Sequence, residues 1–129
     1  MVSGERHTAT GHGLESFPSG RRLRRRPEFT RVYDKGRRES GRLAVVFARP
    51  SNGQRMRLGV TVTRKAGGAV VRNLLRRRVR EIFRRSAILA GAIAHDVVVN
   101  LSPRAASAPF SELRGELERL LARAIGRPA

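Results

Sequence analysis

Residues 64–85 read RKAGGAVVRNLLRRRVREIFRR, which predicts a basic loop, a glycine pair and a strongly basic helix. At about 100° per residue, the apolar side chains of this helix gather on one side and the polar ones on the other. The apolar side consists of Val71, Leu75, Val79, Ile82 and Phe83, with Leu74 at its edge. The opposite side carries Asn73, Arg76, Arg77, Arg80 and Arg84. One side can therefore enter a core while the other presents a row of guanidinium groups.

This row of arginines is suited to a polyanion. Arginines four residues apart stand about 6 Å from each other along a helix, close to the spacing of phosphates in a nucleic-acid strand. The planar fork of an arginine also binds two phosphate oxygens at once. Like charges at this spacing repel one another, and a bound polyanion removes that repulsion. Nucleic-acid binding is therefore favoured over a basic face that serves only solubility.

The composition limits the class of protein. With 129 residues and a formal net charge of +18, the chain is expected to be one domain that binds nucleic acid or an anionic membrane. Its apolar runs are far too short to span a membrane, and its N-terminus lacks the apolar centre of a secretory signal. There is no cysteine, so neither a disulfide framework nor a thiolate metal site is expected. We expect a cytoplasmic protein.

The first residues differ from the rest of the chain. They are rich in Gly, Ser, Thr and His and show no hydrophobic period, so we predict a disordered extension at residues 1–20 and a folded domain at residues 21–126. His7 and His12 lie in this extension without a carboxylate or cysteine partner in a structured setting. No metal site is therefore predicted.

The remaining elements predict a single small α+β domain, with about four strands and three helices in the order α-β-β-(β)-α-β-α. Pro27 and Glu28 suit the start of a first helix, and Gly36 suits its end. Residues rich in β-branched and aromatic side chains predict strands at 42–48, 57–63 and 95–101, with an Asn52-Gly53 turn after the first. In the first strand Leu43, Val45 and Phe47 point one way and Ala44, Val46 and Ala48 the other. The last helix, residues 110–124, buries Phe110, Leu113, Leu117, Leu120, Leu121 and Ala124.

Two aromatic residues share a face of the first helix. The spacing of Phe29 and Tyr33 favours core positions; the alternative is a groove in which bases stack, at about 1–3 kcal/mol per base. Arg57, Gly59 and Thr61 form a small polar strand face, which either admits a nucleic-acid strand or meets solvent.

The stretch 57–84, RLGVTVTRKAGGAVVRNLLRRRVREIFR, closely resembles the signature of the bacterial ribonuclease P protein component. Phe29, Tyr33, Phe47 and the run from Asp96 to Val99 extend the resemblance to about residues 20–125. In that family a sheet is flanked by helices, and the basic helix lies in a left-handed β-α-β crossover. The general rule for such crossovers would predict a right-handed one.

The resemblance also implies a function. In this family the protein joins a catalytic RNA that removes the 5′ leader of precursor tRNA with Mg²⁺, and the protein itself carries no catalytic residue and binds no cofactor. One protein per RNA is expected. For binding the catalytic RNA we assign Arg64, Lys65, Arg72, Asn73, Arg76, Arg77, Arg80 and Arg84. For a leader cleft between the sheet and the first helix we assign Phe29, Tyr33, Phe47, Arg57 and Thr61.

Three positions depart from the family pattern. Leu74 replaces a common arginine, Gly68 stands where asparagine is common, and Arg78 stands where an apolar residue is usual. On the helical wheel Arg78 falls between Val71 and Leu74, so its side chain is expected to extend to the surface or to RNA.

The sequence also bears on functions of other classes. A structural RNA-binding protein of ribosomal type would use the same helix and sheet. A self-sufficient nuclease would need clustered carboxylates or histidines, whereas Asp34, Glu81 and Asp96 are scattered along the chain. His95 and Asp96 are strand neighbours that point to opposite faces, so they are not expected to act as an acid/base pair. Strands on both sides of the basic helix argue against a DNA-binding helix-turn-helix.

Overall fold

The computed structural model describes residues 22–51, 56–86 and 93–125, so the predicted extension at residues 1–20 and the Asn52-Gly53 turn lie outside the described residues. The predicted α+β order is confirmed, with the fourth strand between the first helix and the predicted strand at 42–48. The helices and strands are α2 (Arg26–Lys35), β1 (Arg37–Ser40), β2 (Ala44–Pro50), β3 (Arg57–Val62), α3 (Ala69–Arg85), β4 (His95–Leu101) and α4 (Phe110–Ile125). Short 3-10 turns follow β3 and β4 as η2 (Arg64–Ala66) and η4 (Pro103–Ser107). None of the described helices is long and apolar enough to cross a membrane.

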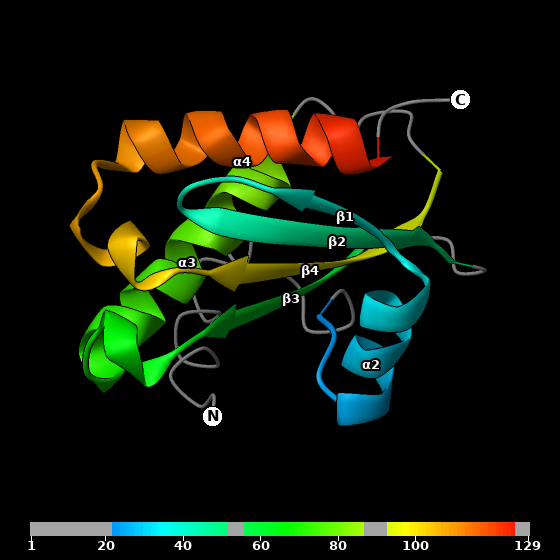
Figure 1. Ribbon diagram of the computed structural model, residues 1–129, viewed down its shortest axis with the longest axis horizontal. Helices are drawn as coiled ribbons and strands as arrows, with labels where there is room; N and C mark the ends of the chain where they lie inside the picture. Colours follow the sequence, from blue (N-terminus) through cyan, green and yellow to red (C-terminus); the bar gives the residue numbers. More distant parts are fainter. Residues whose placement is uncertain (1–21, 52–55, 87–92, 126–129) are drawn as a thin grey trace, which may run out of the picture.

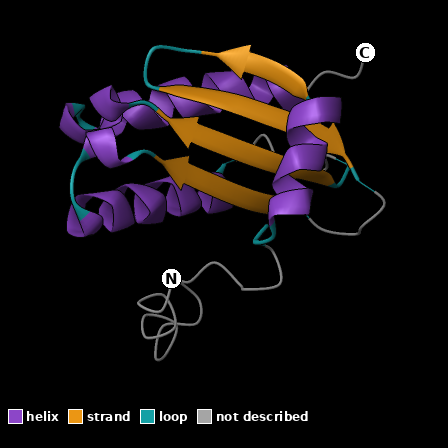
Figure 2. Cartoon of the chain, turned by 60° about the horizontal axis from the view of Figure 1, so that its bottom comes forward, coloured by secondary structure: helices purple, strands orange, loops and turns teal. Residues whose placement is uncertain are grey.

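The four strands form one mixed sheet in the order β1-β2-β4-β3 (Figure 1). β2 pairs antiparallel with β1 and β4, whereas β3 and β4 run parallel. A parallel pair needs a long crossover, and here α3 supplies it. With α2 in front, β3 and β4 both point left, β4 lies above β3, and α3 runs behind the sheet (Figure 2). This path is a left-handed crossover, as the family resemblance implied.

The helices cover the two faces of the sheet unequally. α2 packs on one face, and α3 and α4 pack on the other (Figures 1 and 2). Side chains alternate accordingly: Val46, Val97 and Val99 enter the core under α3 and α4, while Phe47 and Val98 face α2. Leu43 was predicted to point with Phe47, but it lies in the core with Val46, because the strand and its alternation begin only at Ala44.

The basic helix enters the core as predicted. Leu75, Val79, Ile82 and Phe83 are buried on its apolar side, and Val71 packs against them at its first turn. Because this side is one continuous stripe, α3 can lie flat on the sheet while its arginines remain outside.

Strand β1 has no hydrophobic signal in the sequence. Its four residues, RRES, are all polar, and three of them are exposed. They pair with β2 at the edge of the sheet, from Arg37 opposite Ala48 to Ser40 opposite Val45. The preceding Gly36 does end α2, but in an extended conformation; a Cβ there would lie 2.5 Å from the Val32 carbonyl oxygen and 3.0 Å from that of Ala48. Close backbone approach, not a left-handed cap, therefore requires this glycine.

Helix α4 buries a glutamate that periodicity did not predict. Glu116 is only 5% exposed, and its Oε2 accepts hydrogen bonds from the backbone amides of Leu43, at 2.7 Å, and Ala44, at 3.0 Å. The carboxylate thereby fastens the turn between β1 and β2 onto α4. In contrast, Phe110 was predicted to be buried and is 38% exposed, because it is the first residue of the helix, before the buried stripe that starts at Leu113.

We expect Glu116→Ala to lower the free energy of unfolding by about 2–4 kcal/mol, because two buried amides lose their charged acceptor. Glu118→Ala is the matched control on the same helix, since it removes a carboxylate whose ion pair with Arg114 is exposed, and it should cost at most about 0.5 kcal/mol. Urea unfolding followed by circular dichroism measures both. Equal losses would contradict a structural role for Glu116.

Candidate nucleic-acid interface

The turn before α3 presents the first two predicted basic residues. Arg64 and Lys65 are exposed in η2, and the chain then reverses at Gly67, whose φ of 146° is a conformation that favours glycine. The Nε of Arg72 donates a hydrogen bond to the Gly67 carbonyl oxygen at 3.1 Å. The basic turn is therefore fixed to the first turn of the helix.

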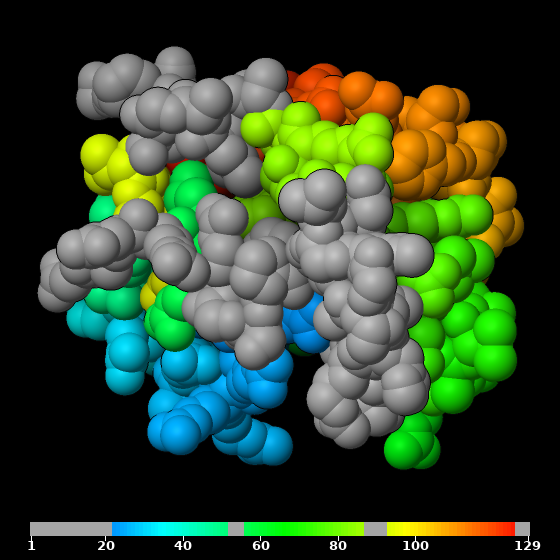
Figure 3. Space-filling view, turned by 180° about the vertical axis from the view of Figure 1, so that it is seen from behind, coloured from blue at the N-terminus to red at the C-terminus, as the bar shows by residue number. Residues whose placement is uncertain are grey.

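The arginines of α3 form a continuous basic side along the helix. Asn73 and Arg77 are exposed, and Arg72, Arg76, Arg80 and Arg84 are partly exposed. Asn73 orients one of these cations, since its Oδ1 accepts a hydrogen bond from Arg76 Nη1 at 2.9 Å. Seen from behind, η2 and the start of α3 (green) lie at the opposite edge of the molecule from α2 (blue) (Figure 3). We call Arg64, Lys65 and the polar side of α3 the basic surface.

The two unusual residues of α3 lie at the surface. The guanidinium carbon of Arg78 is 5.9 Å from the ring centre of Phe110, so this arginine extends over the exposed aromatic residue at the start of α4. Leu74 is 39% exposed, beside the arginines and outside the buried stripe. The predicted surface position of Arg78 is confirmed, with an aromatic ring as its contact within the chain.

The other predicted residues gather on the α2 face of the sheet. Phe47 and Tyr33 meet edge to face with ring centres 4.9 Å apart, and Tyr33 is 37% exposed. Phe29 is partly buried against β3, where a Cβ on Gly59 would lie 2.5 Å from its ring. Gly59 therefore makes room for Phe29, which packs as the sequence spacing favoured, while Tyr33 keeps an accessible edge.

Asn100 of β4 links α2 to β3 on this face, and the sequence analysis did not assign it to the site. Its Oδ1 is 3.1 Å from the hydroxyl of Tyr33 and 2.6 Å from the hydroxyl of Thr61. Thr61 and Asn100 lie opposite each other in the parallel pair of strands. The sequence signal that could have identified Asn100 is its polar side chain, which interrupts the apolar run of β4.

Arg57 also faces α2, but two carboxylates hold it. Its Nε and Nη2 donate to the two oxygens of Asp96 at 3.0 and 3.1 Å, and its Nη1 donates to Glu28 Oε2 at 3.1 Å. The hydrogen bonds and charge of Asp96, joined by Glu28, raise the pKa of Arg57 above its already high value. The network ties the first turn of α2 to β3 and β4, so Arg57 has a structural use that its predicted place in the cleft did not include.

Glu28 sits at the centre of that connection. Partial burial alone would raise its pKa, but the backbone amides of Arg24 and Arg25 and the guanidinium of Arg57 all donate to the carboxylate and lower the pKa below its usual value near 4.5. The hydrogen bonds from these two backbone amides measure 2.9 and 3.1 Å, so Glu28 also caps the start of the helix.

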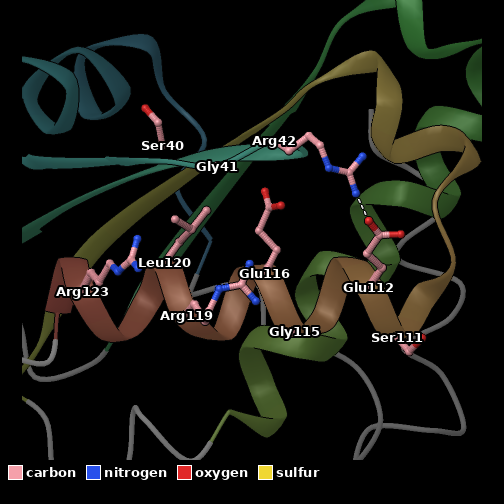
Figure 4. Close-up of a pocket in the computed structure, with 10 residues that line it drawn as sticks. All are labelled: Ser40, Gly41, Arg42, Ser111, Glu112, Gly115, Glu116, Arg119, Leu120 and Arg123. Carbon is pink, nitrogen blue, oxygen red and sulfur yellow. Dashed lines mark ion pairs between the residues drawn. The ribbon is translucent and has the colours of Figure 1, made fainter.

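A pocket on the opposite side of the sheet belongs to neither surface. It has a volume of about 480 Å³ and lies between α4 and the turn that joins β1 to β2 (Figure 4). Its walls include the ion pair of Arg42 with Glu112 and the carboxylate of Glu116. Among the residues that the structure describes, no group of three or more His, Cys, Asp or Glu side chains could hold a metal ion.

Comparison with known proteins decides the family. The ribonuclease P family model matches residues 17–125. The chain belongs to the ribonuclease P protein family. A ribonuclease P protein component from Acidothermus cellulolyticus is 46% identical over 110 residues, which is 83% of this chain and 90% of the relative. The one from Chloroflexus aurantiacus is 37% identical over 84% of this chain and 80% of the relative.

Solved structures of this family share the fold. The ribonuclease P protein from Thermotoga maritima superposes with a TM-score of 0.70 at 34% identity, covering 79% of this chain and 96% of that protein. A Staphylococcus aureus ribonuclease P protein gives 0.73 at 30% identity, covering 81% and 94%. These matches support an RNA-binding protein of tRNA processing and decide against the ribosomal alternative.

The Glu28 network predicts an acid-sensitive stability. Since the folded state lowers the pKa of Glu28, the stabilisation is complete above the unfolded-state pKa, about 4.3 to 4.5, and is lost as the pH falls through the lowered folded-state value. Glu28→Gln should therefore be less stable than the parent protein at pH 7, and its stability should fall less between pH 5 and pH 2. Urea unfolding across this range measures the difference.

The control is Asp34→Asn, which removes a carboxylate from the other end of α2, outside the network. If both variants changed the pH profile equally, the assignment to the Glu28 network would be wrong.

Proposed function

We propose that this chain binds the catalytic RNA of ribonuclease P and the 5′ leader of precursor tRNA, and so assists endonucleolytic removal of the leader to form the mature 5′ end. Family membership over residues 17–125 carries the proposal. Two surfaces of different chemistry support it: a row of cations on α3 and η2, and an aromatic and polar area on the α2 face of the sheet.

The basic surface is assigned to the catalytic RNA. Arg77 is exposed at the middle of α3, and Arg64 and Lys65 are exposed before its start. Such cations lower the repulsion between two RNA molecules and bind phosphate oxygens in pairs. If about six phosphates are neutralised, the affinity should fall with salt with a log–log slope of about −4.

The α2 face is assigned to the leader. Tyr33 offers an aromatic edge beside Phe47, and Thr61 and Asn100 offer polar groups on neighbouring strands. A single strand laid across this face would meet rings for stacking, neutral polar groups and the exposed Arg38 of β1, whose guanidinium carbon lies 5.9 Å from the ring centre of Phe47. Thr61 precedes Arg64 by three residues, so β3 leads from this face directly to the basic surface.

The hydrolysis itself is assigned to the RNA and its Mg²⁺. Several described carboxylates hold the fold: Asp96 and Glu28 bind Arg57, Glu81 pairs with Arg84, and Glu116 binds backbone amides. The protein's part is then to place and neutralise RNA, with one protein per catalytic RNA in the cytoplasm, and without a cofactor of its own.

Reconstitution tests this function directly. Cleavage of a leader-bearing precursor tRNA by the cognate RNA at low Mg²⁺ should be much faster with the protein than without it, because the protein's cations replace part of the screening by Mg²⁺. The protein alone should not cleave. No stimulation by the protein would refute the proposal, and cleavage by the protein alone would revive the nuclease hypothesis.

The basic surface has its own test. Arg76→Ala combined with Arg80→Ala should weaken binding to the catalytic RNA and make the log–log salt slope shallower by about 1.4, or about 0.7 for each lost phosphate contact. The fold should be retained, since both side chains lie outside the buried stripe. Arg114→Ala on α4 is the charge control, and an equal change of slope in that variant would contradict the assigned surface.

A further inference from the structure

On the α2 face, three neighbouring strands each contribute one partly exposed side chain to a row centred on Asn100. In the sheet register Val45 of β2 and Thr61 of β3 lie on either side of Asn100 of β4, and all three are partly exposed. Tyr33 reaches the same asparagine from α2. This row is therefore accessible from the α2 side, with an aromatic ring at its border.

The hydrogen bonds fix which way the Asn100 amide points. Thr61 Oγ1 lies 2.6 Å from Asn100 Oδ1, a distance usual for an O–H donor to an oxygen and shorter than N–H to O bonds of about 2.7–3.2 Å. The Tyr33 hydroxyl donates to the same oxygen at 3.1 Å. Both hydroxyls thus donate to Oδ1, and Nδ2 points away from them.

The Nδ2 of Asn100 keeps its donors available. It makes no hydrogen bond to the described part of the chain, and it is not among the buried polar atoms that lack a partner, so it is accessible to solvent. A half-buried amide held by two hydroxyls has little conformational freedom left to lose when it binds. Asn100 therefore offers a preorganised hydrogen-bond donor at the surface.

The surrounding groups favour a nucleobase over a phosphate as the acceptor. Once Tyr33 and Thr61 have donated, their hydroxyl oxygens can still accept, so donors and acceptors stand side by side as on the edge of a base. A phosphate would need donors alone. Arg57, on the same strand face, is already bound by Asp96 and Glu28. The exposed cation of this face, Arg38, is paired with Phe47 and lies over its ring, whereas Asn100 is paired with Val45. The neutral side chains Val45 and Tyr33 suit a flat, uncharged ring.

We propose that Asn100 is a specificity-determining residue that donates from Nδ2 to an acceptor atom on one unpaired base of the leader. This inference rests on the proposed function and adds to it a residue and a hydrogen bond. Val45 and Tyr33 provide the apolar surroundings of that base, and the Tyr33 and Thr61 hydroxyls hold the amide in place.

The test combines protein variants with modified substrates in the reconstituted holoenzyme. Asn100→Ala should raise KM for a leader-bearing precursor about 3- to 10-fold, the range expected for one net hydrogen bond, and leave kcat at saturation unchanged. Mature tRNA, which has no leader and is not cleaved, should bind the variant holoenzyme as tightly as it binds the parent holoenzyme. An equal weakening of the leader-bearing precursor and of mature tRNA would overturn the proposal.

Abasic nucleotides placed singly along the leader identify the contact. With the parent protein one position should lose affinity, and with Asn100→Ala the loss at that position should be smaller, because the hydrogen bond is already missing and only the contacts of the base with Val45 and Tyr33 remain to be lost. If the losses simply add at every position, the amide binds a phosphate or no part of the leader, and the proposal is overturned.

Asn100→Asp keeps the oxygen that accepts from Tyr33 and Thr61, so it serves if the alanine variant fails to fold. With Asn100→Asp the abasic position should again cause a smaller loss of affinity than it does with the parent protein. The added negative charge alone would weaken every leader equally, whichever base is missing. The two proposals are separable: without stimulation by the parent protein at low Mg²⁺ the proposed function fails, whereas stimulation with purely additive losses overturns only the role of Asn100.

Discussion

The parallel pairing of β3 with β4 is the constraint on which the rest of the structure depends. Because parallel neighbours cannot be joined by a tight turn, the chain must leave the sheet and return through α3. The return path places the apolar stripe of α3 on the sheet and its arginines outside. It also places β4 between two partners, so that this strand contributes Val97 and Val99 to one core and Val98 to the other.

The sheet separates two kinds of surface that RNA binding requires. On the α3 side, the useful property is charge, and the cations stand on a rigid helix. On the α2 side, Arg57 is bound by Asp96 and Glu28, and the accessible groups are an aromatic edge, hydroxyls and an amide, with the cation of Arg38 over Phe47 at the β1 edge. Charge attracts any polyanion over distance, whereas uncharged directional groups distinguish one nucleotide from another. In the proposed function these two tasks fall on opposite sides of the four strands.

Sequence reasoning succeeded where a pattern is long and repeats. The stripe of α3 recurs over four turns, so the helix, its buried side and its exposed arginines were all predicted, and the family resemblance supplied the left-handed crossover. It failed where a feature depends on contacts between distant residues. The polar strand β1 is recognised only by its pairing with β2, and the burial of Glu116 only by its bonds to Leu43 and Ala44.

The same contrast between repeating patterns and contacts of distant residues applies to the candidate site. Residue type and helical spacing were enough to assign the basic surface, because an exposed arginine row needs no partner within the chain. The α2 face was predicted only in part, since the strand register that brings Asn100 to Thr61, and Asp96 to Arg57, cannot be read along the chain. Arg57 was assigned to the cleft without its two carboxylate partners, which lie 29 and 39 residues away along the chain.

The arginine row on α3 has a consequence for the life of the protein before it meets RNA. Cations held side by side on a rigid helix repel one another more than they do in an unfolded chain, which can spread them apart. A polyanion that binds only the folded form removes this repulsion and raises stability in proportion to the logarithm of its concentration. With the proposed RNA as that polyanion, the folded population is expected to rise with the supply of RNA, and proteolysis is expected to act first on protein made in excess of its partner.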